Sequence, residues 1–245
     1  MLQFAKATHT GLVRSHNEDA VDFVPGERWL MVLCDGMGGH SAGEVASQTA
    51  VELLCAEARS GAHTVAEYRK AIGDANAAVY GRSSTDARTH GMGTTLVLAF
   101  GQGREAVVAN VGDSRAYLLR AETGVLRRIT RDHSLVEEML LSGQLTAEEA
   151  KTYPFRNVIT RAVGTSPEVV PDLFEVELAP GDVLLLCSDG LTNEVPDGVI
   201  RFTLLGHPDP QAACEALLQK ALDAGARDNV SICVAKVPEE GGEQP

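Results

Sequence analysis

The chain carries at residues 29–39 the run WLMVLCDGMGG, in which an apolar segment passes directly into an aspartate and a glycine-rich stretch. An unbroken apolar run of this length, from Trp29 to Cys34, is typical of a strand that is covered on both faces. A carboxylate at the end of such a strand is held by a rigid scaffold and faces a cleft. The run therefore predicts a buried strand that ends at a candidate ligand site, Asp35.

Two further aspartates have similar surroundings. Asp189 follows the apolar run at residues 183–187, and Asp228 precedes the apolar run that starts at Val230. Three carboxylates brought together repel one another unless cations neutralise them, and hard divalent ions such as Mg²⁺ or Mn²⁺ suit oxygen ligands. An Asp–Gly pair is most often only a turn, so the residues alone leave a metal site and three separate turns as alternatives.

Other hydrophobic patterns outline the fold. Apolar runs predict strands at residues 94–100, 105–110, 115–119, 183–187 and 230–237. Apolar spacings of three and four predict helices at residues 43–58, 66–80 and 212–222. Short glycine-containing turns at residues 99–103 and 120–124 predict hairpins, and hairpins build antiparallel sheets. The pattern indicates an α+β protein with layered sheets and helices.

The length of 245 residues and a hydrophobic content of 44% suit one domain, which we place at residues 1–237. Residues 132–164 are polar, and we expect them to form a mostly helical insertion over one edge of the sheet. Residues 238–245 are acidic and contain glycine and proline, so a disordered tail is expected there.

Charge and cysteine usage exclude several classes of protein. A net charge of −13 repels nucleic acid and anionic membranes. No signal peptide or long apolar segment is seen, and we expect a cytoplasmic protein with no membrane partner. The cysteines, five in all, lack CxxC spacing, which argues against a zinc site or a disulfide framework. Cys34, Cys187 and Cys233 are expected to be buried thiols.

A series of short motifs resembles the PP2C (PPM) family of metal-dependent serine/threonine protein phosphatases, in its bacterial form. The motifs are RSHNED at 14–19, DGMGG at 35–39, GDSRAY at 112–117, SDG at 188–190 and RDNVS at 227–231. They occur in the family's order, and the resemblance spans residues 2–237. It implies a four-layer αββα sandwich with a two-metal site at one end of paired antiparallel sheets. It also identifies residues 132–164 with the family's variable flap beside the active site.

The resemblance implies a role for each of the aspartates described above. Asp35 would bridge two metal ions, Mn²⁺ or Mg²⁺. Asp189 and Asp228 would complete the coordination of the first ion. The sequence does not choose between the two metals, because both accept oxygen ligands.

The same resemblance implies ligands for the other ions. The backbone carbonyl of Gly36 would bind the second ion, and Glu18 or Asp19 would reach it through water. Asp113 would help to hold a third, more weakly bound ion that shares Asp189.

The implied chemistry is hydrolysis by a metal-bridging hydroxide, with Arg14 clamping the phosphate oxygens through its planar guanidinium. Many eukaryotic relatives have a histidine where this chain has Met37, and a thioether cannot donate a proton. His40 is the candidate general acid, and a plain helix-entry histidine is the alternative. His133 and the other histidines have no second ligand at metal spacing, so we expect ordinary surface or core side chains.

The expected partners are phosphorylated proteins, among them a serine/threonine kinase whose signalling the enzyme would reverse, and the expected state is a monomer. Two alternatives remain at this point. One is a two-metal phosphodiesterase or nuclease, which the negative charge disfavours. The other is a non-catalytic regulator, which the presence of all the expected carboxylates disfavours. The physiological substrate and the choice between phosphoserine and phosphothreonine cannot be read from the sequence.

Overall fold

Strand β3 (Arg28–Met37) crosses the centre of the molecule and is buried on both faces. Its residues 29, 31 and 33 pack into the core between two β-sheets, whereas residues 30, 32 and 34 pack against helices. This alternation is the geometry of a strand whose side chains point to opposite faces in turn. The prediction of a doubly covered strand is therefore confirmed. The structure, a computed structural model, describes residues 1–38 and 42–239.

Two antiparallel sheets lie face to face. The six-stranded sheet consists, in spatial order, of β2 (Asp19–Val24), β3, β5 (Leu96–Gln102), β6 (Glu105–Val111) and β9 (Asp172–Glu177), with β4 (Gly93–Thr94) also paired to β3. The five-stranded sheet consists of β1 (Gln3–His9), β11 (Val230–Lys236), β10 (Val183–Cys187), β7 (Arg115–Leu119) and β8 (Leu126–Arg128). Every pairing is antiparallel, as the predicted hairpins require.

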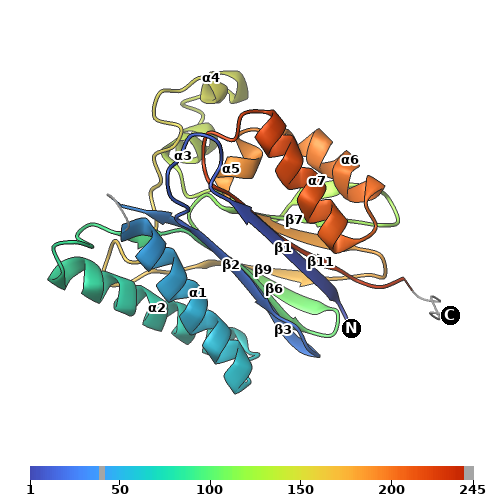
Figure 1. Ribbon diagram of the computed structural model, residues 1–245, viewed down its shortest axis with the longest axis horizontal. Coiled ribbons are helices and arrows are strands. Elements are labelled where there is room, and N and C mark those ends of the chain that lie inside the picture. The colour runs from blue at the N-terminus through green and yellow to red at the C-terminus, as the bar shows by residue number, and fades with distance from the viewer. Residues whose placement is uncertain (39–41, 240–245) are drawn as a thin grey trace.

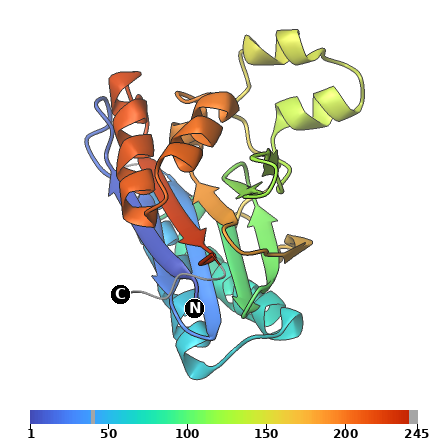
Figure 2. The ribbon, with the colours of Figure 1, turned by 90° about the vertical axis from the view of Figure 1, so that its right-hand side faces the viewer.

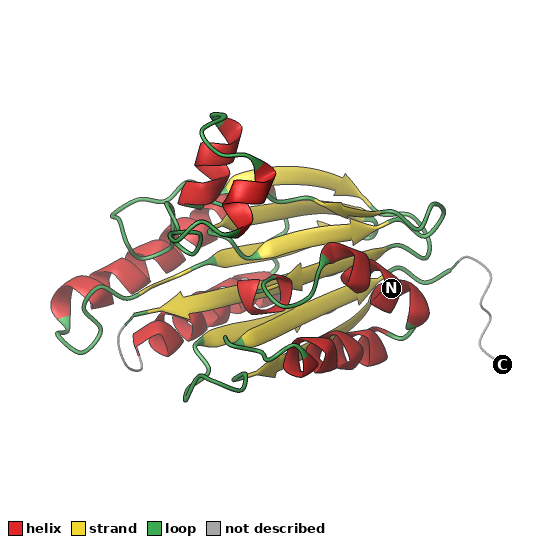
Figure 3. Cartoon of the chain, turned by 90° about the horizontal axis from the view of Figure 1, so that it is seen from above, coloured by secondary structure: helices red, strands yellow, loops and turns green. Residues whose placement is uncertain are grey.

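Helices cover the outer face of each sheet (Figures 1 and 3). The six-stranded sheet packs against α1 (Ala42–Ser60) and α2 (Val65–Thr85). The five-stranded sheet packs against α5 (Asp189–Thr192), α6 (Asp197–Gly206) and α7 (Pro210–Asp223). The result is the four-layer αββα sandwich, so the predicted fold is confirmed. Across residues 1–38 and 42–239, no helix combines the length and the apolar character that crossing a membrane requires.

The flap comprises residues 132–164, and its helical part stands away from the sandwich (Figure 2). Its helices are short, with seven residues in α3 (Leu135–Leu141) and five in α4 (Ala147–Lys151), and turns and loops make up the rest. The prediction of a mostly helical insertion was therefore wrong. Each helix starts at a capping residue, Ser134 or Thr146, but α3 buries none of its residues. Most helical stability in proteins comes from packing, and here little packing extends the helices.

Candidate metal centre

The topology gathers the three predicted aspartates at one end of the sandwich. Asp35 lies near the end of β3, Asp189 is the first residue of α5 directly after β10, and Asp228 lies two residues before β11. All three line one cavity of about 270 Å³. One detail differs from the prediction, because Asp35 lies inside β3 rather than beyond its end. The strand continues to Met37 by pairing with β4, and this places Gly36 in a strand as well.

The cavity collects most of the site residues that the sequence predicts. Its lining consists of Arg14, Glu18, Asp35, Gly36, Met37, Gly38, Thr95, Asp113, Asn157, Ile159, Asp189, Asp228 and Asn229. Asp19 lies behind this surface, directly opposite Asp35 in the β2–β3 pair, and is buried. Its Oδ2 accepts a hydrogen bond of 2.9 Å from the Ser188 hydroxyl. His40, the predicted general acid, lies outside the described residues.

Burial and mutual repulsion make this cluster electrostatically costly. The pKa of Asp35 is well above its usual range because the group is desolvated and because Asp19 and Asp189 repel its negative charge. Desolvation also raises the pKa of Asp19 to about 7, with Asp189 and Asp228 adding repulsion. The pKa of Asp113 rises to about 7, first by burial and then by repulsion from Asp189. A bound cation would remove this penalty, because its charge favours the ionised carboxylates.

The donor set fits hard divalent cations. The cavity offers carboxylate and backbone oxygens, which Mg²⁺ and Mn²⁺ prefer. Two carboxylate oxygens, Glu18 Oε1 and Asp19 Oδ1, are buried without a hydrogen-bond partner. As the side chains stand, no three His, Cys, Asp or Glu groups of residues 1–38 and 42–239 converge closely enough to hold an ion. An ion held by three of these side chains would therefore require side-chain rotation, and relief of the carboxylate repulsion would favour that rotation.

The backbone of Gly36 lines the cavity at a position where there is no room for a side chain. A Cβ atom on Gly36 would collide with the backbone oxygens of Glu18 and Gly43. The Gly36 amide also donates a hydrogen bond of 3.1 Å to the Glu18 carbonyl. The absence of a side chain therefore allows β3, the Glu18 segment and the start of α1 to meet beside the carboxylates.

Arg14 brings a positive charge to the rim of the cavity. Its Nη2 lies 2.8 Å from Asp228 Oδ2, and the side chain is 52% exposed. The guanidinium has five N–H donors and this ion pair uses only part of them, so donors remain for a phosphate group.

Asn229 fixes the segment that carries Arg14 and Glu18. Its Nδ2 donates to the carbonyls of Thr10 at 2.8 Å and His16 at 2.9 Å. Its Oδ1 accepts a hydrogen bond of 2.8 Å from the Glu18 amide. Sequence analysis did not single out Asn229, although it lies inside the RDNVS motif directly after Asp228.

Hydroxyl groups form hydrogen bonds with the backbone of Asp35. The Thr95 hydroxyl accepts a hydrogen bond of 2.9 Å from the Asp35 amide and lies 2.8 Å from the Ser114 hydroxyl. The Thr94 hydroxyl donates to the Asp35 carbonyl at 2.9 Å. These contacts fix the Asp35 backbone and connect it to the loop that carries Asp113.

His133 anchors the same loop from the flap side. Its Nδ1 accepts a hydrogen bond of 3.0 Å from the Gly112 amide, next to Asp113, and the side chain is buried. Its Nε2 lies 3.2 Å from Asp172 Oδ2, which is within ion-pair distance. The structure gives His133 a supporting role as a core side chain.

Comparison with known proteins places this geometry in a family. The sequence profile of the protein phosphatase 2C family matches residues 10–222. The serine/threonine phosphatase Stp of Listeria monocytogenes is 39% identical over 237 residues, which cover 94% of this chain and 93% of Stp. The serine/threonine protein phosphatase PstP of Mycobacterium tuberculosis is 39% identical over 239 residues, which cover 97% of this chain but 45% of PstP.

Solved structures agree with the sequence comparison. A crystal structure of PstP superimposes with a TM-score of 0.89 at 38% identity, covering 97% of this chain and 99% of the other. The catalytic domain of PstP in complex with two manganese ions superimposes with a TM-score of 0.87 at 38% identity, with the same coverage. The motif order, the αββα sandwich and the carboxylate cavity lead to one conclusion: the chain belongs to the protein phosphatase 2C family of serine/threonine protein phosphatases.

Proposed function

We propose that this chain hydrolyses phosphoserine and phosphothreonine in proteins at the cavity formed by Asp35, Asp189 and Asp228. The observation that carries the proposal is the meeting of these aspartates with Glu18 and Arg14 in one cavity. The carboxylates supply oxygen ligands for cations, and the guanidinium supplies donors for the phosphate. The relatives named as serine/threonine phosphatases support the choice of substrate.

Each acidic group has its own proposed role. Asp35 would be shared by two ions, with Asp189 and Asp228 completing the first site. The Gly36 carbonyl would belong to the second site, with Glu18 or Asp19 acting through water. When bound, the divalent cations lower the pKa of a water molecule so that it can attack phosphorus, and they neutralise the developing negative charge.

A third ion at Asp113 remains a proposal, as does the choice between Mn²⁺ and Mg²⁺. Asp113 and Asp189 line the same cavity, and burial first and repulsion from Asp189 second raise the pKa of Asp113. A cation there would relieve that repulsion. The two manganese ions of the related PstP domain support a two-metal site here.

Arg14 and the leaving group complete the proposed reaction. Arg14 would turn from Asp228 to the phosphate oxygens, which its fork-shaped guanidinium matches through two parallel hydrogen bonds. This movement is open to it because the side chain is half exposed. Protonation of the departing serine or threonine oxygen by His40 stays a prediction from the sequence.

The test is phosphate release from a phosphothreonine peptide. We expect turnover that requires Mn²⁺, stops on addition of EDTA and is lost in Asp35→Asn, because the amide removes the negative charge between the two ions. The matched control is Asp74→Asn on α2, where the aspartate is 60% exposed and pairs with Lys70. Activity that survives Asp35→Asn would refute the proposed centre. Cleavage of phosphodiesters without cleavage of the phosphopeptide would favour the nuclease alternative instead.

Several wider expectations rest on the same proposal. We propose that residues 1–237 act as one phosphatase unit, that a serine/threonine kinase is among the substrates, and that the enzyme works as a monomer in the cytoplasm. The net charge of −13 supports the absence of a nucleic-acid partner. The proposed disordered tail at 238–245 lies mostly outside the described residues, which end at Glu239.

A further inference from the structure

Buried hydroxyl groups close the core between the two sheets at the end that carries the metal centre. On β10, Leu184 and Leu186 point into this core, and Ser188 continues the same alternation by one step. Three further hydroxyls stand in the same relation to the inward apolar residues of β11, β5 and β7, namely Ser231, Thr95 and Ser114. All four side chains are buried, and we call them the hydroxyl layer.

Asp19 reaches the hydroxyl layer from the six-stranded sheet. It lies two residues before Val21, which packs in the core between the sheets, and directly opposite Asp35 in the β2–β3 pair. Opposite residues of an antiparallel pair have Cβ atoms about 5 Å apart on the same face of the sheet. The carboxylate of Asp19 is therefore a neighbour of Asp35, and it faces the serines of the other sheet.

The hydrogen bonds of Ser188 determine the direction in which its hydroxyl donates. Its Oγ accepts from the Ser231 amide at 2.9 Å, and its own amide donates to the Ser231 carbonyl at 3.1 Å. The hydroxyl hydrogen is left for an acceptor, and Asp19 Oδ2 lies 2.9 Å away, whereas the Asn229 carbonyl lies 3.5 Å away. The Ser188 hydroxyl therefore donates to Asp19, and β11 holds it in place.

Ser231 supplies a second hydroxyl to the same carboxylate. Burial raises the pKa of Asp19 to about 7, and hydrogen bonds from Ser231 and Ser188 act against this rise. The Ser231 hydroxyl also lies 2.7 Å from that of Thr8, which accepts from Asn17 Nδ2 at 2.8 Å. Hydrogen bonds to the charged form of a carboxylate stabilise that form, which is the form that binds a cation.

The two oxygens of the Asp19 carboxylate have different surroundings. Oδ2 accepts from Ser188, whereas Oδ1 is buried and has no hydrogen-bond partner in the part of the chain that the structure describes. A buried oxygen without a partner costs free energy, and a cation or a cation-bound water would satisfy it. The arrangement leaves one oxygen of Asp19 available beside Asp35.

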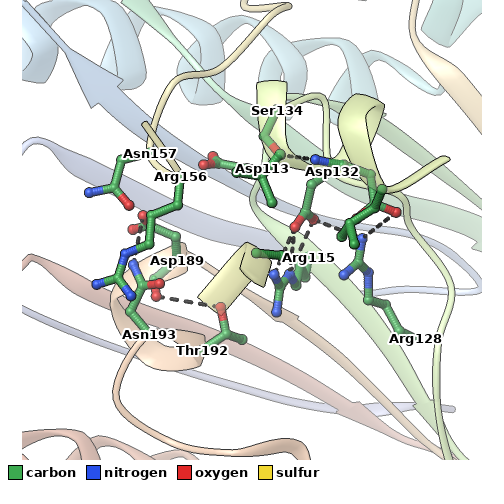
Figure 4. A pocket seen from close by; sticks show the side chains of 14 residues that line it. Asp113, Arg115, Arg128, Asp132, Ser134, Arg156, Asn157, Asp189, Thr192 and Asn193 are labelled. Carbon is green, nitrogen blue, oxygen red and sulfur yellow. Dashed lines mark hydrogen bonds and ion pairs between the residues drawn. The ribbon is translucent and has the colours of Figure 1, made fainter. Parts of the chain in front are cut away.

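Asp189 follows Ser188 in the chain but has its own support. It lines the metal cavity and a second cavity of about 370 Å³ on the flap side, where Figure 4 shows its side chain beside Asn193. Asn193 Nδ2 donates to Asp189 Oδ2 at 3.0 Å. Removal of the Ser188 hydroxyl therefore deprives Asp19 of a hydrogen bond and leaves the one to Asp189 in place.

We propose that Ser188 is a positioning residue of the metal centre, whose hydroxyl holds Asp19 Oδ2 and leaves Oδ1 for an ion or its bound water. This inference rests on the proposed phosphatase function, because it requires cations beside Asp35. Loss of a partner that orients a metal ligand typically weakens metal binding by 10- to 100-fold. We expect Ser188→Ala to raise the Mn²⁺ dissociation constant about tenfold.

Isothermal titration calorimetry of the metal-free protein with Mn²⁺ measures this change. Asp19→Asn should weaken binding as well, and Ser188→Ala should add nothing further in that background, because no carboxylate is left to position. The matched control is Thr203→Val, which removes a buried hydroxyl that donates to the Val199 carbonyl within α6. The control should keep the wild-type dissociation constant.

Hydrolysis of a phosphothreonine peptide gives a second measurement. Ser188→Ala should be slower than wild type when Mn²⁺ is limiting, and an excess of Mn²⁺ should restore most of its kcat. A residue that only stabilised the fold would lower the rate by the same factor at every Mn²⁺ concentration.

The inference is overturned if Ser188→Ala binds Mn²⁺ as tightly as wild type, or if it weakens binding equally in the Asp19→Asn background. Failure of the phosphatase function looks different, because wild type itself would then neither bind Mn²⁺ nor release phosphate, and the inference would fall with it. Urea denaturation in EDTA shows whether each variant is folded. If Ser188→Ala is not, Ser188→Cys replaces it, because a thiol is a weaker donor, and wild-type affinity in that variant would overturn the inference equally.

Discussion

Asn229 holds three backbone groups with one side chain, and these groups belong to a segment more than two hundred residues earlier in the sequence. The side chain is buried, so water cannot replace the lost hydrogen bonds if it is removed. The segment that it fixes carries both Arg14 and Glu18. The geometry of the metal centre therefore depends on a residue that need not touch an ion or the substrate.

We expect Asn229→Ala to lower the free energy of unfolding by about 3 kcal/mol, because three hydrogen bonds of a buried side chain are lost. Urea denaturation measures this change. The same variant should lower kcat, since Arg14 is no longer held in position. Gln219→Ala is the control, because Gln219 is an exposed amide that bonds to Asp223. Unchanged stability in Asn229→Ala would contradict the supporting role.

At this scale the sequence predicted which residues share the cavity better than it predicted the residues that support them. The acidic residues and Arg14 were identified because they occur in ordered motifs, and the structure places Asp35, Asp113, Asp189 and Asp228 in one cavity. The hydrogen bonds made by Asn229, Thr95 and His133 join segments that are distant in the chain. No local pattern of residue types reports such bonds, because they depend on how the sheets bring the segments together.

Helix α2 shows how a single element is stabilised by charge at its first turn. The Thr64 hydroxyl accepts from the Glu67 amide at 3.2 Å, and the Glu67 carboxylate accepts from the Thr64 amide at 2.9 Å, which forms a capping box. Hydrogen bonds from the backbone of His63 and the side chain and backbone of Thr64 lower the pKa of Glu67 to about 2. The carboxylate is therefore more stable as an anion in the folded protein than in the unfolded chain.

This shift predicts a pH dependence. A pKa that folding lowers contributes stability that is fully present above the unfolded value, 4.5, and is lost as the pH falls through about 2. Between these values wild type should lose more stability than Glu67→Gln, which keeps a cap but has no charge to lose. Chemical denaturation at pH 6 and at pH 3 measures the difference. Parallel losses in the two proteins would contradict the assignment.

Among the elements that sequence analysis missed are strands of mixed apolar and polar character, such as β1 and β9. Continuous apolar runs revealed β3, β5, β6, β7, β10 and β11, all within a few residues of their observed bounds. Strands β1 and β9 are edge strands whose residues are mostly half-buried or exposed. An edge strand needs apolar residues on only part of its surface, so the search for unbroken runs could not detect it.

The folded protein brings carboxylates that repel one another together at the metal centre, and a bound cation should reduce this repulsion. We expect Mn²⁺ to raise the unfolding temperature of wild type, with a stabilisation of about 2.7 kcal/mol at one hundred times the dissociation constant. In EDTA, Asp35→Asn should unfold at a higher temperature than wild type, because one buried charge has been removed. Differential scanning fluorimetry measures both effects.

The same assay should separate the variant at the metal centre from the surface control. Asp35→Asn should gain little or nothing from Mn²⁺, whereas the surface control Asp74→Asn should follow wild type in both buffers. An unfolding temperature of wild type that Mn²⁺ leaves unchanged would show that the carboxylates do not form a cation site.

Strand β1 has one neighbour in its sheet, and that neighbour is β11, with Gln3 opposite Lys236 and His9 opposite Val230. During synthesis β1 therefore stays without a partner strand until β11 has left the ribosome. Arg14 follows β1 and Asp228 precedes β11, so the two meet only after this last pairing. Pairing between strands that are so far apart in the sequence predicts that the protein folds slowly. The active site should accordingly form only when β11 pairs with β1, and we expect a chain that stops before β11 to have no phosphatase activity.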